Sequence, residues 1–229
     1  MMTVSNVLFA VGAIIAAYLI GSVNFAVIFT NLFVGKDVRN SGSGNAGTTN
    51  VLRTAGFLPG ALTFIFDAAK GFAGAFIGKA AFDYLFTLTG LTVFTPVYGA
   101  YLCYVFVMVG HIFPVFFSFR GGKGIATSVG GFAVCCWPAI VIGLIAFAVS
   151  TLISKIVSLS SLISTIFVVS FAIVFRNVSI AGTAENTLPQ IIMAIIAGVI
   201  VFYTHRTNIV RLLRGEEKKL KIGRGNKNG

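Results

Sequence analysis

Long apolar runs separated by short polar segments dominate the chain, and most are near the ~20 residues that a helix needs to cross a membrane core. Trp137 and Pro138 interrupt the fourth run, and proline breaks a helix unless neighbours compensate for its missing N–H group. That run is therefore either one long span or two helices, at 124–136 and 139–154. The six runs are 7–33, 57–80, 94–118, 125–153, 157–175 and 188–203.

The placement of Lys and Arg decides between these arrangements, because short cytoplasmic loops carry an excess of positive charge. Seven elements with an outer N-terminus place every cation inside except Lys79 and Arg176, which lie outside, and Lys70, which lies within a span. Six elements would instead put Lys155 and the basic tail outside. The sequence therefore predicts an all-α integral membrane bundle of seven transmembrane elements, with a short fourth helix, an outer N-terminus and a cytoplasmic C-terminus.

The composition agrees with a membrane protein, because 57% of the residues are hydrophobic and 10% are charged. A soluble domain carries about 25% charged residues. These values exclude a soluble globular domain, a disordered chain and a nucleic-acid binder, although the net charge is +11. We expect one membrane domain over 1–229, with a basic cytoplasmic tail at 206–229. Cys103, Cys135 and Cys136 lie in apolar runs without CxxC spacing, so they predict neither a disulfide nor a metal site, and we expect no cofactor.

A glycine-rich polar segment at 41–50 follows the first apolar run. Its glycines let the backbone turn several N–H groups toward one point, an arrangement that binds anions. Arg53 adds a planar cation suited to phosphate. This pattern favours phosphate binding, and the alternative is a flexible loop that caps a helix. The candidate phosphate ligands are Ser43, Gly44, Asn45, Thr49, Asn50 and Arg53.

A second polar cluster covers 110–124 and ends in Arg-Gly-Gly-Lys-Gly. Lys123 stands where the short fourth helix is expected to begin, so free N–H groups and the helix dipole would help it hold an anion. The alternative is that Arg120 and Lys123 only anchor the topology. His111 lies near the inner end of its span, where a hydrogen-bonded packing role is the favoured interpretation.

A third cluster ends the last apolar run. His205 and Asn208 have i,i+3 spacing, which places them on one helix face, and Arg211 continues the row. With Arg206, this face could meet a phosphorylated polyol. The alternative is a helix that leaves the membrane with snorkelling cations.

Two smaller features lie within or beside the spans. Asp67 and Lys70, also spaced i,i+3, are opposite charges inside one span, where ionisable groups are costly and usually paired. Mutual neutralisation alone would explain the pair as well as a functional role does. Ser158 and Ser161 face one side of their span, and helix capping is the alternative role for them.

These segments together resemble the bacterial acyl-phosphate:glycerol-3-phosphate acyltransferase family over most of the chain. The resemblance implies a seven-helix membrane enzyme whose active site opens to the cytoplasm. It also implies transfer of a fatty acyl group from acyl phosphate, not acyl-CoA, to the first hydroxyl of glycerol 3-phosphate, giving lysophosphatidic acid and phosphate. The matching stretches are Gly21-Ser22, SGSGNAGTTNVLR (41–53), FDAAKG (66–71), GHIFPVFFSFRGGKGIAT (110–127), SLSS (158–161) and HRTNIVRLLRG (205–215).

The resemblance also assigns roles residue by residue. Arg120 and Ser160 are small departures from the family pattern. The implied partners are glycerol 3-phosphate, fatty acyl phosphate and membrane lipid, with a soluble transacylase that forms acyl phosphate as a further candidate. The implied catalytic residues are Ser161, His205 and Asn208. The implied phosphate and acceptor ligands are the six candidates of the first segment, together with Lys123, Arg206 and Arg211. Asp67 and Lys70 are the implied supporting pair.

The chemistry of this reaction fits such residues. Two phosphates in one low-dielectric pocket need cations, and a mixed anhydride needs orientation and charge stabilisation more than a strong nucleophile. Positions 116 and 210 hold Phe and Val, so neither histidine starts an HxxxxD motif. We therefore expect direct attack by the acceptor hydroxyl, with its proton passing to His205 or to the donor phosphate. The short fourth helix is expected to leave a groove for the acyl chain beside Gly130 and Gly131.

A transporter or channel for phosphorylated metabolites is the alternative function, since basic loops could form an anion funnel. Transporters are often built from repeated halves. The chain shows no internal repeat, and the predicted topology puts every polar cluster on one side, which favours the enzyme.

Overall fold

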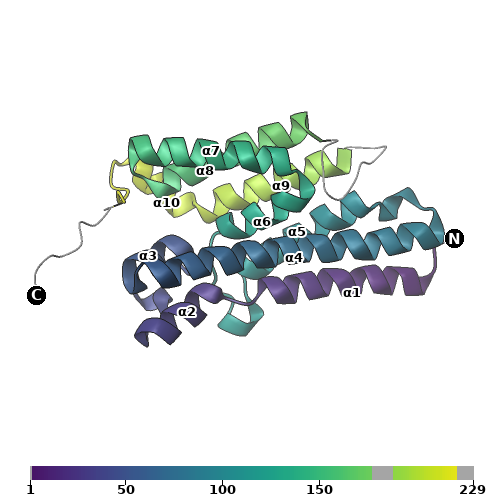
Figure 1. The fold of residues 1–229 in the computed structure, drawn as a ribbon, viewed down its shortest axis with the longest axis horizontal. Helices are drawn as coiled ribbons and strands as arrows, with labels where there is room; N and C mark the ends of the chain where they lie inside the picture. Colours follow the sequence, from purple (N-terminus) through teal and green to yellow (C-terminus); the bar gives the residue numbers. More distant parts are fainter. Residues whose placement is uncertain (1, 177–187, 221–229) are drawn as a thin grey trace, which may run out of the picture.

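A computed structural model of the chain describes residues 2–176 and 188–220. Regular structure in these ranges is helical, and no strand occurs in them. The long helices run side by side along the molecule (Figure 1). The α-helices are α1 Val4–Gly21, α2 Phe25–Val34, α3 Thr48–Ala55, α4 Phe57–Thr89, α5 Pro96–Ile112, α6 Ile125–Cys135, α7 Trp137–Ser154, α8 Val157–Val174, α9 Leu188–Thr204 and α10 Arg206–Leu213; short 3₁₀ turns are η1 Val38–Asn40, η2 Thr92–Phe94 and η3 Val115–Phe117.

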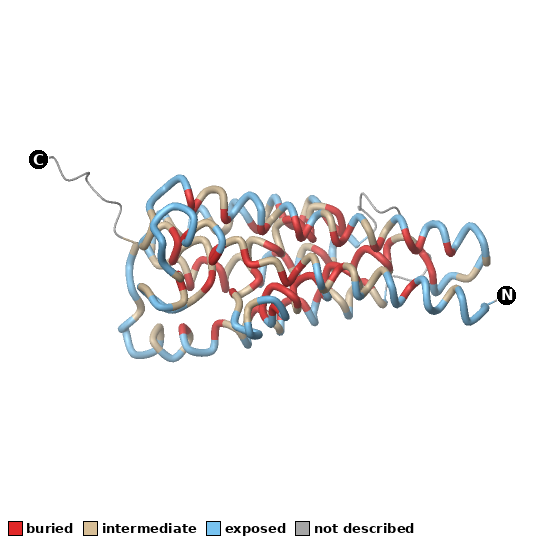
Figure 2. The backbone as a smooth tube through the Cα atoms, turned by 90° about the horizontal axis from the view of Figure 1, so that it is seen from below, coloured by how far each residue is buried: buried red, intermediate tan, exposed pale blue. Residues whose placement is uncertain are grey.

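The buried part of the bundle is centred on α5, which packs against α1, α4, α6 and α9. Its Tyr101, Tyr104 and Met108 are almost wholly buried, and Figure 2 shows buried backbone along the middle of the molecule. Large apolar side chains on the outside stay exposed, such as Leu152 and Ile153. These side chains are expected to face lipid, since an apolar surface of this extent is unusual for a soluble monomer.

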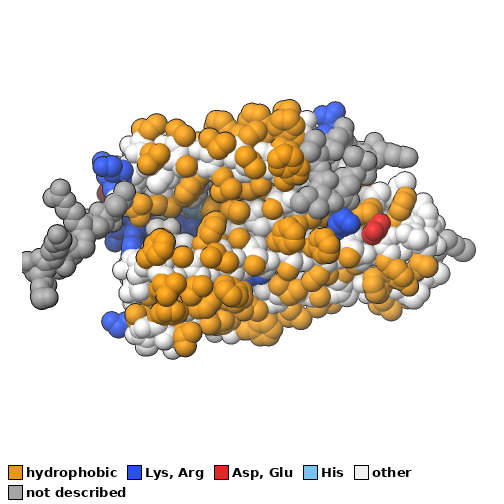
Figure 3. Space-filling model, viewed as in Figure 1, with side chains coloured by type: hydrophobic (Ala, Val, Ile, Leu, Met, Phe, Trp, Pro, Cys, Tyr) orange, Lys and Arg blue, Asp and Glu red, His pale blue; other side chains and the backbone are white. Residues whose placement is uncertain are grey.

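Charged side chains lie mainly at the ends of the bundle rather than along its apolar sides (Figure 3). Within residues 2–176 and 188–220, five helical segments are long and apolar enough to cross a membrane, and α9 with α10 would add a sixth if this pair, bent by 60°, is one span. The fold is that of an integral membrane helix bundle. The seven-element count and the orientation of the two termini stay predictions.

The short fourth helix expected at 124–136 is confirmed as α6, whose 11 residues span only ~17 Å. The chain breaks at Cys136, and α7 starts at Trp137, two residues before the predicted start. Pro138 lies in the first turn of α7, where its missing N–H group would have no helical partner in any case. The break thus lies one residue before the interruption predicted at Trp137 and Pro138.

Two predicted boundaries differ from the structure. The first run is not one continuous helix, because the chain leaves the helix between Gly21 and Phe25, and the Asn24 side chain then accepts a hydrogen bond from the Val27 N–H at the start of α2. The second run was expected to end at residue 80, but α4 continues to Thr89 and ends at Gly90, which has a left-handed φ of 66°. Residues 81–89 are mostly apolar, and Ala81, Phe82 and Leu85 pack in a buried cluster with Phe94, so helix packing continues beyond the predicted end.

Glycines allow α6 to lie directly against α4. A side chain at Gly71 of α4 would collide with the Thr127 carbonyl, and one at Gly130 of α6 would collide with the Ala68 carbonyl. Gly131 is covered in the same way by the Tyr104 ring. The expected groove beside Gly130 and Gly131 is therefore wrong, because these glycines serve close helix packing.

Candidate functional site

A pocket of about 780 Å³ opens near the end of the bundle where α3 and α10 lie, and Figure 3 shows this hollow between the α7–α8 side and the α4 side. It gathers residues that are far apart in the chain. Of the predicted site residues, Lys70 alone does not line it. The predicted residues that do are Ser43, Gly44, Asn45, Thr49, Asn50, Arg53, Asp67, Lys123, Ser161, His205, Arg206, Asn208 and Arg211.

The glycine loop (residues 41–50) is shaped by the buried side chain of Asn50. The Asn50 Oδ1 accepts a hydrogen bond from the Ser43 N–H at 2.9 Å, and its Nδ2 donates to the carbonyls of Ser41 and Val38, both at 2.9 Å. Gly42 has a left-handed φ of 61° and leaves room for this amide. The amide of Asn50 is thus engaged within the loop, which it holds in shape.

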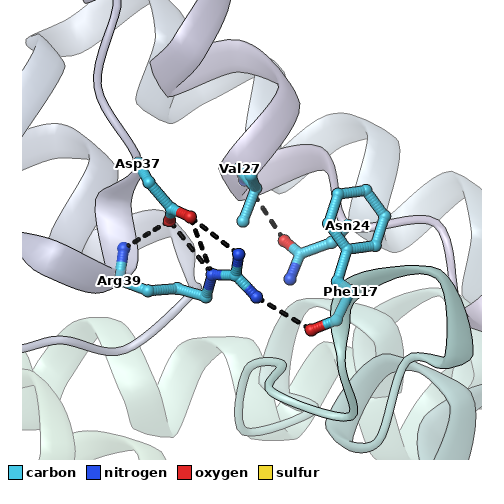
Figure 4. A network of polar contacts seen from close by, with 5 residues as sticks. All are labelled: Asn24, Val27, Asp37, Arg39 and Phe117. Atoms are coloured by element: carbon cyan, nitrogen blue, oxygen red, sulfur yellow. Dashed lines mark hydrogen bonds and ion pairs between the residues drawn. The ribbon is translucent and has the colours of Figure 1, made fainter.

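Arg39 links the segment before the glycine loop to the next polar cluster (Figure 4). Arg39 contacts Asp37 at 2.7 Å, and its Nη1 donates to the Phe117 carbonyl of η3 at 2.8 Å. The Arg39 guanidinium holds the pKa of Asp37 below its usual value. The two loops that carry most of the predicted phosphate ligands are therefore linked outside the pocket.

Lys123 stands at the end of a turn that we call the lysine turn (residues 121–124), directly before α6. Its ammonium group donates a hydrogen bond to Asn208 Oδ1, and its carbonyl accepts one from Thr204 Oγ1 at 3.1 Å. Burial lowers the pKa of Lys123 to about 8, and nearby Arg211 acts in the same direction, while Glu217 opposes them. A bound phosphate would supply the counter-charge that this ammonium lacks.

His205 occupies the corner between α9 and α10 and is nearly fully buried. Its Nδ1 lies 2.9 Å from the Val201 carbonyl. Because a carbonyl oxygen can only accept, Nδ1 carries the proton and the neutral ring keeps Nε2 as an acceptor. The predicted row of His205, Asn208 and Arg211 does line the pocket. His205 can thus accept a hydrogen bond from a hydroxyl group.

Glu217 is a pocket residue that the sequence analysis missed. Its carboxylate accepts hydrogen bonds from Asn208 Nδ2 at 2.7 Å, Ser158 Oγ at 2.9 Å and Arg211 Nε at 2.6 Å. Burial opposes its ionisation, but these hydrogen bonds outweigh burial and lower the pKa of Glu217. The available signal was an acid inside a basic tail, in a chain with only six Asp and Glu residues.

The remaining predicted groups differ in how freely they can meet a ligand. Ser161 donates its hydroxyl proton to the Val157 carbonyl at 2.9 Å, so its oxygen remains as an acceptor. Arg53 and Arg206 are exposed at the pocket rim. The predicted pair of Asp67 and Lys70 is confirmed, with Nζ and Oδ1 2.8 Å apart.

The pocket has a polar part and an apolar part. Lys and Arg side chains and the glycine loop form the polar part, while Phe64, Ile125 and Phe147 line the apolar part. Within residues 2–176 and 188–220, no three His, Cys, Asp or Glu side chains gather as a metal site requires. The arrangement suits an anionic headgroup joined to an apolar tail.

Sequence comparison places the chain among known membrane enzymes. The sequence model of the family described as "Glycerol-3-phosphate acyltransferase" matches residues 11–215. Two relatives named glycerol-3-phosphate acyltransferase come from Thermoanaerobacter sp. (strain X514) and Francisella tularensis subsp. mediasiatica (strain FSC147). The first is 41% identical over 216 residues, covering 93% of this chain and 96% of the relative. The second is 39% identical over 207 residues, covering 90% of this chain and 91% of the relative.

Solved structures give the same result. The crystal structure of PlsY, an integral membrane glycerol 3-phosphate acyltransferase, in its glycerol 3-phosphate form superimposes with a TM-score of 0.77. The sequences are 34% identical, and the match covers 93% of this chain and 96% of that chain. The lysophosphatidic acid form of PlsY matches with a TM-score of 0.75 and 32% identity, covering 93% and 95% of the two chains.

Proposed function

This chain belongs to the glycerol-3-phosphate acyltransferase family, and from that premise we propose that it uses a fatty acyl phosphate as donor. In the proposed reaction the first hydroxyl of glycerol 3-phosphate forms an ester with the acyl carbon, and the bond from that carbon to the phosphate oxygen breaks. The products are lysophosphatidic acid and inorganic phosphate. The reaction would begin phospholipid synthesis at the cell membrane.

The observation that carries this proposal is the convergence of three basic or glycine-bearing segments on one pocket. Both reactants carry a phosphate group, and their mutual repulsion in a poorly hydrated pocket would be severe without cations. Arg53, Lys123, Arg206 and Arg211 come from three segments of the chain, and the glycine loop adds N–H groups. The pocket therefore has the charge needed to hold two anions together.

We assign the two phosphates to different parts of the pocket. The glycine loop, with Ser43 and Thr49, suits one phosphate, because N–H groups and hydroxyl groups can surround it. Lys123 and Arg211 suit the other, since both lie beside the α9–α10 corner. Asn50 supports the first site from within the loop rather than contacting a ligand.

The acceptor hydroxyl is assigned to the corner. His205 offers Nε2 as an acceptor, and Asn208 is held beside it by Lys123 and Glu217. The Ser161 oxygen adds a second acceptor. The hydroxyl oxygen would attack the acyl carbon directly, and its proton would pass either to His205 or to an oxygen of the departing phosphate. Orientation and charge stabilisation supply most of the rate, because phosphate leaves readily from an anhydride.

The acyl chain is assigned to the apolar part of the pocket. Phe64 of α4, Ile125 of α6 and Phe147 of α7 line it. Each buried CH₂ group contributes ~0.8 kcal/mol, so a long chain strongly favours an apolar path to lipid. The short α6 contributes to this path through Ile125 rather than through Gly130 and Gly131.

We place the pocket on the cytoplasmic side of the cell membrane, because the excess of Lys and Arg lies at that end of the sequence-based topology. A soluble enzyme that forms acyl phosphate would then reach it directly. The tail cations Lys221, Arg224 and Lys227, which enter this argument, lie outside the described residues.

The test is an assay with purified protein in sealed vesicles. Glycerol 3-phosphate and palmitoyl phosphate are supplied, with palmitoyl-CoA as the control donor, and lysophosphatidic acid is measured by mass spectrometry. We expect product from palmitoyl phosphate and little from palmitoyl-CoA. Uptake of glycerol 3-phosphate without product would instead select the transporter alternative, and equal use of palmitoyl-CoA would overturn the assigned donor.

A further inference from the structure

Three ionisable side chains meet inside the bundle below the pocket. Lys70 Nζ and His111 Nδ1 lie 2.8 Å and 3.5 Å from the same Asp67 oxygen. All three residues are at most 4% exposed. Lys70 also donates a hydrogen bond to the Val23 carbonyl at 2.6 Å, where the chain breaks between α1 and α2. Buried charge is tolerated when it is paired in this way.

The members of this group differ in their access to the pocket. Asp67 and His111 line it, whereas Lys70 does not. Lys70 thus balances the charge of Asp67 from the side away from the pocket. Asp67 in turn faces the Nδ1 edge of the His111 imidazole. The Nε2 of His111 lies on the opposite edge of the ring.

That opposite edge lies against the lysine turn. The Gly122 N–H donates to the His111 carbonyl at 3.1 Å, and the Gly121 N–H donates to the Ile112 carbonyl at 3.1 Å, so the turn folds back onto the end of α5. A side chain at Gly122 would collide with His111 Nε2 and with the Ala46 carbonyl. The ring therefore lies between Asp67 and the two loops that carry Lys123 and the glycine segment.

We propose that His111 is a positioning residue that supports the lysine turn, and so sets where the Lys123 ammonium meets a substrate phosphate. The Asp67 carboxylate faces the Nδ1 edge of the ring at 3.5 Å, and the Nε2 edge packs against Gly122. The inference rests on the proposed function, in which Lys123 binds a phosphate of this reaction. Replacing residues that orient the ligands of a metal ion typically changes affinity or activity by about 10- to 100-fold, and we expect the lower end of this range for the support of a lysine.

Two substitutions separate the edges of the ring. The amide nitrogen of Asn can take the place of imidazole Nδ1 beside Asp67 but does not reach Gly122. The longer Gln can place its amide nitrogen where Nε2 stands. We expect His111→Asn to raise KM and Kd for glycerol 3-phosphate by about tenfold and to move the pH midpoint of affinity set by Lys123. We expect His111→Gln to stay within about threefold of wild type, as it keeps the edge that supports the turn.

Tyr104→Phe is the matched control. Tyr104 is buried in the same helix, does not line the pocket, and would lose its 2.9 Å hydrogen bond to Ser128. It should change melting temperature without changing KM or Kd. If His111→Asn does not fold, His111→Gln decides alone: wild-type affinity with a wild-type pH midpoint supports the proposal, and a raised Kd overturns it.

Binding is measured by calorimetry with glycerol 3-phosphate alone, and turnover is measured with palmitoyl phosphate. A wild-type protein that binds but makes no lysophosphatidic acid would refute the proposed function and leave the binding test of His111 intact. An unchanged KM and Kd in His111→Asn overturns the inference. So does a lower melting temperature with lower kcat but unchanged KM and Kd, because that pattern belongs to a scaffold residue.

Discussion

The glycine loop and the α9–α10 corner present polar groups to the same pocket but are held in different ways. The loop is closed by its own Asn50, whose three hydrogen bonds all stay within 12 residues of the chain. The corner depends on distant partners, since Asn208 is held by Lys123, 85 residues away, and by Glu217 from the segment after α10. A local motif can thus carry its own geometry, whereas the corner exists only in the assembled bundle.

The largest effect should come from removing the link between the corner and the lysine turn. Lys123→Met keeps much of the side-chain volume but removes the charge and the hydrogen bond to Asn208. We expect kcat/KM to fall by about 10³-fold, the upper end for one preorganised donor. Lys123→Arg is the control for charge, and steady-state kinetics with both substrates provide the measurement. A fall below tenfold in Lys123→Met would show that the corner does not need this link.

Disrupting the glycine loop should lower kcat/KM somewhat less than the loss of Lys123. Asn50→Ala removes all three hydrogen bonds and should lower kcat/KM by about 10²-fold, because a shift of roughly 1 Å in a binding group has this effect. Asn50→Asp keeps the acceptor for the Ser43 N–H and should retain part of the activity. Equal loss in both variants would indicate that Asn50 contacts substrate, contrary to a purely local role.

Weakening the contacts that Glu217 makes with the α9–α10 corner should have a moderate effect on KM for glycerol 3-phosphate. Glu217→Gln keeps the shape of the side chain but removes the charge that pairs with Arg211 at 2.6 Å. We expect KM for glycerol 3-phosphate to change by about tenfold, in the range typical of a hydrogen bond to a charged group. Glu216→Gln, the adjacent acid, is the control. An effect of the same size at both positions would mean that general charge in the tail matters, and not the contact with the corner.

Changing pH should give the smallest effect near neutrality. The pKa of Lys123 is about 8, so the ammonium is charged below that pH and loses its proton above it. If Lys123 binds the phosphate as proposed, glycerol 3-phosphate requires the charged form, so its Kd should rise by up to about tenfold per pH unit above 8 and be flat below. Calorimetry across pH 6.5–9.5 would show this profile. Arg stays charged throughout this range, so a Lys123→Arg variant that keeps the rise would assign it to another group.

The same contrast explains what could be predicted from the sequence. Gly42 and Gly44 predict the loop, and Pro138 predicts the helix break after α6. Both the loop and the break depend on residues that are close together in the sequence. The break after Gly21 was missed because Ser22 and Asn24 barely change the apolar character of the run. Its stability depends on Lys70, which lies 47 residues away from Val23.

Contacts between distant segments account for the other misses. The role of Glu217 depends on where residues after α10 return to the pocket, and the position of His111 depends on how α4 faces α5. Spacing alone cannot supply either. It did predict the pairing of Asp67 with Lys70, since i,i+3 neighbours meet on one helix. His205 and Asn208 both line the pocket, but His205 lies at the bend before α10 rather than within one helix with Asn208.

The shortness of α6 has a consequence for where the two reactants can meet. At ~17 Å, α6 is shorter than the ~30 Å hydrocarbon core of a bilayer. In the proposed function, this shortness would let water follow the polar wall of the pocket below the level of the headgroups. Glycerol 3-phosphate would then stay hydrated as it enters the pocket, and the proposed acyl donor would keep its chain among the lipid tails. Neither reactant would then have to leave its own solvent, because water and lipid would meet inside the protein at the place proposed for formation of the ester bond.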